Sequence, residues 1–162
     1  KRQCLSALGR IQEARAILEH LSRSHPRLTD VDAFGTVNLM MAETHAIYSE
    51  VRPALSSYGH ALLAHEPCVV LSSLRGIGHL LSAEIDAQLC AYCLGAVLAG
   101  KVTWLRDRQL AGEMLADLRR RGPADEIEQA RAQGAATPLK EVVQDVRAAL
   151  SRRLPLPIAV TD

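Results

Sequence analysis

The sequence is poor in aromatic residues, which account for 3% of its 162 positions, with one Trp, one Phe and three Tyr. Sandwiches and barrels of β-strands depend on β-branched and aromatic side chains, so this scarcity argues against them. The hydrophobic share is still 48%, and most of it comes from Ala, Leu and Val. Such side chains suit closely packed helices, and a chain of this length buries roughly 70% of its unfolded surface in one core.

The chain also lacks an excess of either charge, with 19 basic and 18 acidic residues. This balance gives no electrostatic basis for binding nucleic acid or an anionic membrane, and we expect neither partner. Its four cysteines lack the spacing of a disulfide framework, and no signal-peptide pattern precedes them, which favours a cytoplasmic location. The most apolar segment, Leu89 to Ala99, is far shorter than the roughly 20 residues of a membrane span, and we predict that it forms the most buried helix.

Apolar residues recur at helical spacing along almost the whole chain. The first stripe consists of Leu8, Ile11, Ala14, Leu18 and Leu21. Because no long segment alternates apolar and polar residues, we predict an all-α fold of about eight helices. Proline and glycine mark the expected helix ends. The further helices are predicted over residues 30–51, 53–66, 69–99 with a break at Gly76 and Gly78, 102–121, a short segment after Pro123, and 138–153.

Two polar residues are expected to begin helices. Thr29 or Asp30 is placed to cap the helix over residues 30–51, since their side chains accept hydrogen bonds from the first free amides of a helix. Thr137 and Pro138 form a cap and first-turn pair for the last helix.

The opening stretch resembles the second half of a tetratricopeptide repeat. Leu8 and Gly9 stand at the turn between paired helices, Ala14 at the small contact position and Leu18 at the large apolar position. Pro26 ends the unit twelve residues after Ala14, which is the spacing of that family. The preceding helix would then be a stub, so we expect the chain to be a segment of something longer.

A fainter copy follows, with Ala54, Tyr58, Ala61 and Pro67 at the corresponding places and one extra residue before the proline. The resemblance implies helical hairpins stacked as a short α-solenoid, and the alternative is an irregular helical bundle. In either case we expect a single domain over residues 1–153. Residues 1–67 would be its repeat-like helices, 68–153 its further helices, and 154–162 a tail or linker with two prolines.

The same resemblance implies a function in binding rather than chemistry. Stacked helix pairs create a concave surface that is lined largely by the first helix of each pair. The partner would be another protein or a peptide, and the chain a scaffold or regulatory segment without a cofactor. The candidate binding residues lie on the polar side of residues 30–51 and are Asn38, Glu43, His45 and Glu50.

One alternative is a helical sensor domain for a small molecule or a metal. If residues 79–93 form one helix, then His79, Asp86, Cys90 and Cys93 lie on the same side of it. His79 is about 20 Å from Cys93 along such a helix, so only Asp86, Cys90 and Cys93 could share a metal. A structural role, with two small buried cysteines in the most apolar helix, is the competing interpretation.

No local motif indicates an enzyme. The sequence contains no GxSxG elbow, no phosphate loop of the GxxxxGK[ST] type and no HExxH pair. The stretch "RGIG" at residues 75–78 is too short to hold a phosphate and is expected to mark a turn or a close helix crossing. We therefore predict a non-enzymatic protein.

Overall fold

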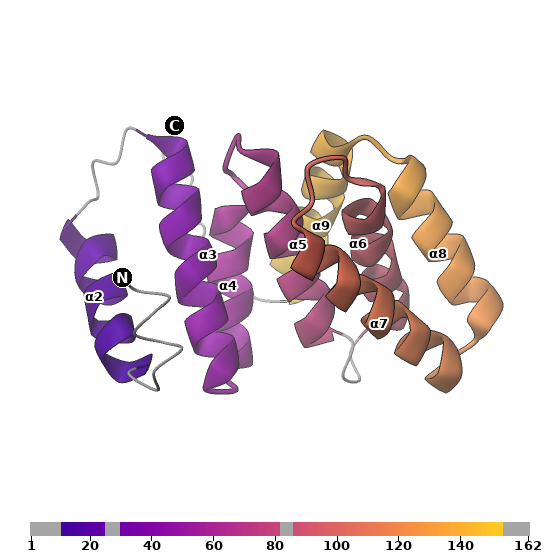
Figure 1. Ribbon diagram of the computed structural model, residues 1–162, viewed down its shortest axis with the longest axis horizontal. Coiled ribbons are helices and arrows are strands. Elements are labelled where there is room, and N and C mark those ends of the chain that lie inside the picture. Colours follow the sequence, from indigo (N-terminus) through magenta and orange to yellow (C-terminus); the bar gives the residue numbers. More distant parts are fainter. Residues whose placement is uncertain (1–10, 25–29, 82–85, 154–162) are drawn as a thin grey trace.

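The computed structural model describes residues 11–24, 30–81 and 86–153 and contains eight helices and no strand in these ranges (Figure 1). The all-α fold with about eight helices is thus confirmed. The first four helices are α2 (Ile11–Ser24), α3 (Val31–Ile47), α4 (Val51–Ala61) and α5 (Pro67–Leu81). The others are α6 (Ala87–Ala99), α7 (Leu105–Arg121), α8 (Ala124–Ala136) and α9 (Leu139–Arg153).

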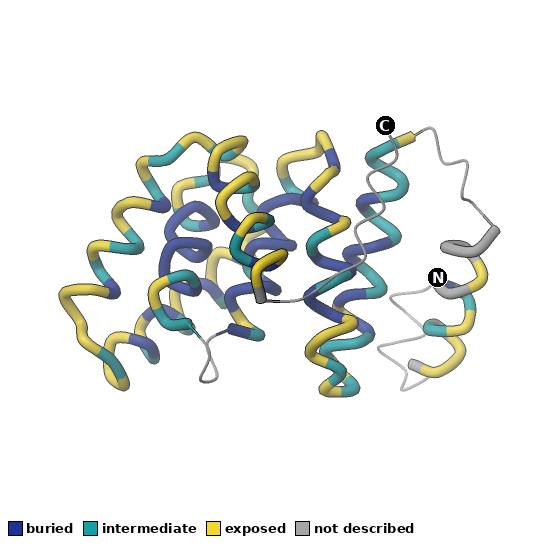
Figure 2. Tube along the Cα trace, turned by 180° about the vertical axis from the view of Figure 1, so that it is seen from behind, coloured by how far each residue is buried: buried dark blue, intermediate teal, exposed yellow. Residues whose placement is uncertain are grey.

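The helices from α3 onward form two layers. In the view of Figure 1, α3, α5 and α7 lie toward the viewer, and α4, α6 and α9 lie behind them. We call α3, α5 and α7 the front layer, and α4, α6 and α9 the rear layer. Consecutive helices α3 and α4, and α5 and α6, pack as hairpins, and α2 packs on the outside of α3. Figure 2 shows that the buried segments concentrate in the middle of the molecule, around α4, α5 and α6.

Helix α6 is the centre of the core, as its sequence predicts. Every residue from Cys90 to Val97 is buried, and α6 contacts α5, α7, α8 and α9. A single hydrophobic cluster extends from Leu39 in α3 to Leu150 in α9. None of the helices in the described ranges combines the length and apolar composition that a membrane crossing requires.

Several predicted helix ends are confirmed and others are wrong. Asp30 caps α3, since its carboxylate accepts hydrogen bonds from the amides of Asp32 and Ala33. The expected continuation of this helix to residue 51 is wrong, because Ser49 adopts a left-handed conformation with φ of 59° and separates α3 from α4. Thr137 does not cap the last helix, since its hydroxyl donates to the carbonyl of Gln133 at the end of α8.

The expected break at Gly76 and Gly78 is also wrong. Helix α5 continues through both glycines, and Gly76 instead gives room to the ring of Tyr58 on α4. A methyl group at Gly76 would come within 2.1 Å of the Tyr58 Cζ atom. The other expectation for "RGIG", a close helix crossing, is therefore correct.

Some predicted features lie outside the described residues. These are Leu8, Gly9, Pro26, Thr29 and the expected tail at 154–162. Ala14 belongs to α2, but its side chain is outside the described part, so the proposed tight contact at this position stays a prediction.

Two glycines allow α6 and α8 to touch through their backbones. A methyl group at Gly134 of α8 would lie 1.9 Å from the carbonyl oxygen of Tyr92 in α6. A methyl group at Gly95 of α6 would lie 2.1 Å from the carbonyl oxygen of Arg131 in α8. Since real side chains do not approach backbone this closely, both positions require glycine, and α8 packs more extensively on α6 than on its sequence neighbour α7.

We predict that Gly134→Ala lowers the free energy of unfolding by about 1–3 kcal/mol, the usual cost of overpacking a tight contact. The helices α6 and α8 must separate to admit the methyl group. The packing energy that is lost exceeds the stability gained from the higher helix propensity of alanine. Urea denaturation followed by circular dichroism measures the change.

Gly112→Ala is the matched control, because Gly112 lies in α7 and a methyl group there would meet no atom within 4 Å. Removing an exposed helical glycine should raise stability by roughly 0.5–1 kcal/mol. Equal effects of the two substitutions would contradict the close contact of α6 and α8.

Candidate functional site

The four predicted binding residues on α3 and its end do not form one surface. Asn38 is buried, with 7% of its surface exposed, and its side-chain amide donates to the carbonyl of Phe34 at 2.9 Å. Asn38 thus lacks the exposure expected of a residue on a binding face, because its amide faces its own helix. Glu43 is exposed, whereas His45 in the last turn of α3 and Glu50 just before α4 are half-buried.

His45 and Glu50 take part in the attachment of α2. The Glu50 carboxylate lies 2.5 Å from Nδ1 of His45 and accepts a hydrogen bond from Arg15 of α2 at 2.9 Å. The Arg15 guanidinium also lies over the ring of Tyr48, 5.6 Å from its centre. These contacts lower the pKa of Glu50, through the hydrogen bonds from His45 and then Arg15. The ionised Glu50 carboxylate therefore stabilises the attachment of α2 at pH values above the ordinary pKa of a glutamate. This stabilisation is lost as the pH falls through the lowered pKa of Glu50.

A row of charged side chains links the three helices of the front layer. Arg75 of α5 donates from Nε to Asp107 of α7 at 3.1 Å, and from a terminal nitrogen to Glu43 of α3 at 3.1 Å. Asp107 also accepts a hydrogen bond from the hydroxyl of Ser72. Its side chain is 6% exposed and that of Arg75 is 14% exposed. Because a buried carboxylate is costly without partners, this pairing fixes the first turn of α7 against α5.

Tyr58 supports this row from the rear layer. Its ring packs against Gly76, one residue after Arg75, and is almost fully buried. Burial raises the pKa of its hydroxyl to about 12; the Arg75 guanidinium opposes this rise, and the weaker effects of the Glu43 and Asp107 carboxylates add to it. The tyrosine is therefore neutral at physiological pH and adds no charge to the row.

The turn between α6 and α7 has an unusual arrangement of polar and apolar side chains. The hydroxyl of Thr103 points inward and donates to the carbonyls of Val97 at 2.7 Å and Gly100 at 3.0 Å. Arg108 donates to the same Gly100 carbonyl at 2.6 Å. Gly100 is packed so closely against Thr103 and Leu71 that a methyl group there would lie within 2.6 Å of both side chains. The turn is therefore held by specific contacts.

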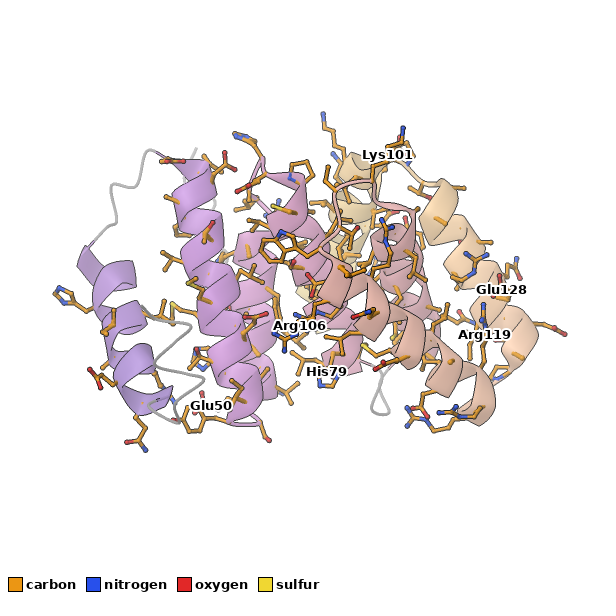
Figure 3. All side chains as sticks on the ribbon, viewed as in Figure 1. Glu50, His79, Lys101, Arg106, Arg119 and Glu128 are labelled. Atoms are coloured by element: carbon orange, nitrogen blue, oxygen red, sulfur yellow. The ribbon has the colours of Figure 1, made fainter. Side chains whose placement is uncertain are left out.

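Apolar side chains point outward from this fixed turn. Val102 is 55% exposed, Trp104 52% and Leu105 73%. Exposed basic residues flank them, while the one acidic residue of the segment, Asp107, is buried. We call this surface the exposed strip; it consists of Lys101, Val102, Trp104, Leu105, Arg106 and Arg108. Figure 3 labels Lys101 near its upper end and Arg106 lower down the front of the molecule.

Sequence reasoning missed the exposed strip because it placed Val102 inside a helix. Helix α7 begins three residues later, at Leu105, and Trp104 occupies the capping position without a side-chain hydrogen bond to the helix. A tryptophan is a poor cap, since it offers no acceptor to the free amides. The only tryptophan of the chain, directly before a helix and among basic residues, was the available signal.

The structure does not assemble the residues of the metal or sensor hypothesis. Residues 79–93 are not one helix, because α5 ends at Leu81 and α6 begins at Ala87. Asp86 caps α6 by accepting a hydrogen bond from the amide of Leu89 at 2.8 Å. Within the described ranges, no three His, Cys, Asp or Glu residues are grouped so that they could hold a metal ion.

Cys90 and Cys93 lie in the core. Both are fully buried, and burial raises the pKa of the Cys90 thiol to about 12 and raises that of Cys93 as well. Cys68, at the start of α5, is half-buried, and its thiol pKa is raised by burial and by a hydrogen bond with Glu66. The two core thiols therefore act as small apolar side chains.

Comparison of the chain with models of protein families, with curated proteins and with solved structures gives no match in any of the three. A function must therefore be inferred from the residues themselves.

We predict that Asp107→Ala lowers the free energy of unfolding by about 1–3 kcal/mol, because it removes the buried acceptor of Ser72 and Arg75 and leaves Arg75 with only its exposed partner Glu43. Chemical denaturation measures the loss. Glu43→Ala is the matched control, since Glu43 pairs with the same arginine but is exposed, and it should cost at most about 1 kcal/mol. A larger loss for Glu43→Ala than for Asp107→Ala would show that Asp107 does not fix α7.

A second prediction concerns the thiols. In the folded protein at pH 8, a maleimide should label the half-buried Cys68 slowly but leave Cys90 and Cys93 unlabelled, because the thiols of Cys90 and Cys93 are buried and protonated. In denaturant all three should react at similar rates. Mass spectrometry of the digested protein assigns each site, and fast labelling of Cys90 without unfolding would contradict its place in the core.

Proposed function

We propose that the chain is a non-enzymatic interaction module that binds another protein or a peptide through its front layer and the exposed strip. The observation that carries this proposal is the outward position of Trp104 and Leu105 on a turn held by hydrogen bonds. Val102, Trp104 and Leu105 are three of the six exposed large apolar side chains of the described residues and fall within four positions of the chain. Exposed apolar residues that are grouped rather than scattered mark an interaction site. Trp and Arg are also the residue types that contribute most to binding energy at interfaces.

The regular placement of the front helices supports the proposal. Helices α3, α5 and α7 start at residues 31, 67 and 105, which are 36 and 38 residues apart. These intervals are close to the 34-residue unit of tetratricopeptide proteins. We infer that the hairpins α3–α4 and α5–α6 act as repeat-like units, and that their first helices share one binding face with α7.

The polar residues of the front layer support binding rather than catalysis. Asp107, the most buried carboxylate of the described ranges, is fully engaged by Ser72 and Arg75 and holds the surface in place. Of the residues named from the sequence, Glu43 stays in the proposed face because it is exposed and belongs to this layer. We place the module in a reducing compartment such as the cytoplasm, consistent with the free thiols of Cys68, Cys90 and Cys93.

Site-specific photocrosslinking tests the proposal. A benzophenone amino acid replaces Leu105 in the exposed strip, and the variant is irradiated in an extract of the cells that make the protein. We expect a discrete crosslinked partner, identified by mass spectrometry and competed by excess unlabelled protein, because the side chain is 73% exposed on the proposed face.

The control places the same amino acid at Lys140, which is exposed on α9 in the rear layer. This variant should give no such product. If neither position captures a partner, or both capture the same proteins, the front layer is not the binding face.

A further inference from the structure

We propose that the exposed strip binds an acidic, amphipathic peptide segment of the partner, with Trp104 and Leu105 as the apolar anchor and Lys101 and Arg106 as the sites that pair with carboxylates. This inference rests on the proposed function and specifies the chemistry of its partner.

The apolar anchor is exposed by the way the turn is built. Thr103, the polar residue, is turned inward and its hydroxyl donates to two carbonyls, whereas Val102 and Trp104 on either side of it point outward. A turn that served only to connect α6 and α7 would expose the polar residue and bury the apolar ones. Because the turn is already fixed, a partner would order few of its side chains on binding, which favours affinity.

The charge of the strip is set by which ionised groups of this segment reach solvent. Lys101, Arg106 and Arg108 are exposed, and Asp107 between the two arginines is buried against Ser72 and Arg75. The ion pair therefore removes the only negative charge of residues 101–108 from the surface. An apolar anchor flanked by three cations complements a peptide that carries leucine or phenylalanine among aspartates and glutamates.

The extent of the basic surface favours a peptide over a lipid headgroup layer. Beyond Arg108, α7 exposes Glu113 and then carries Asp117, which pairs with Arg120 and Arg121. The positive charge of the first turn and the residues before it is thus separated by Glu113 and Asp117 from the arginines at the end of the helix. Membrane-surface helices instead present a continuous apolar face with basic residues along their length, and an acidic segment with two or three carboxylates fits the shorter surface.

The tryptophan makes a direct test simple, since Trp104 is the only one in the chain and its fluorescence reports on the exposed strip alone. The purified full chain is titrated with two short synthetic peptides without tryptophan. One alternates Glu and Asp with Leu and Phe, and the other has lysine in place of each acidic residue. We expect a saturable blue shift of the emission with the acidic peptide that weakens as salt is added, and none with the basic peptide.

Two matched double variants, each changing the net charge by the same amount, show whether the strip is responsible. Lys101→Glu with Arg106→Glu should weaken binding of the acidic peptide at least about tenfold, because both cations become like charges. Lys140→Glu with Arg152→Glu changes exposed residues of α9 in the rear layer and should leave binding unchanged. Trp104→Ala, measured by calorimetry, should also weaken binding at least about tenfold, as for a central aromatic anchor.

The remaining outcomes overturn the inference. Equal binding of both peptides would mean that charge does not select the partner, and equal weakening by both double variants would mean a response to net charge alone. A blue shift with phosphatidylserine vesicles but not with the acidic peptide would identify a lipid surface as the occupant. If no peptide binds while crosslinking at Leu105 still captures a partner, the interaction module stands and only its acidic chemistry is wrong.

Discussion

The buried contact of Asp107 with Arg75 and Ser72 is the constraint on which the front of the molecule depends. It joins α7 to α5, and Arg75 extends the connection to Glu43 on α3. A carboxylate at this depth is tolerated only because charged and hydroxyl donors surround it. Its burial has a second effect, since it leaves lysine and arginine as the only exposed charged residues between residues 101 and 108. One interaction thus sets both the position of α7 and the charge of the exposed strip.

Most of the architecture follows from the sequence. Helical spacing of apolar residues gave the number and approximate limits of the helices, and the apolar run around Cys90 identified the central one. The errors fall where tertiary contacts outweigh local preference. Gly76 was expected to interrupt α5. The absence of a side chain there instead leaves room for the ring of Tyr58, and the packing of the two helices compensates for the low helix propensity of glycine. Likewise, a left-handed residue that follows a helix is usually glycine, whereas here it is Ser49, so the sequence does not indicate the end of α3.

The candidate site was less accessible to sequence reasoning. Of the four residues named in advance, Glu43 alone is both exposed and part of the front layer, whereas Asn38 faces its own helix and His45 and Glu50 stabilise the attachment of α2. Polar residues on a helix were taken to face solvent, although a side chain at i can return to the carbonyl at i−4. The exposed strip was overlooked for the opposite reason. Trp104 and Leu105 have the composition of a core segment, and only the inward hydrogen bonds of Thr103 reveal that they point outward.

The paired glycines of α6 and α8 also fix how these two helices can slide and turn. Gly95 meets the backbone at Arg131, and Gly134 meets the backbone at Tyr92, so both contacts are satisfied together in a single register. Adding one residue to α8 between Arg131 and Gly134 would rotate Gly134 by about 100° relative to Arg131 and bring a side chain to the contact with Tyr92. Substitutions on the outer face of α8 leave this register intact, whereas an insertion or deletion between Arg131 and Gly134 does not. The spacing of these two residues, rather than the exposed sequence of α8, therefore sets how the two helices are aligned.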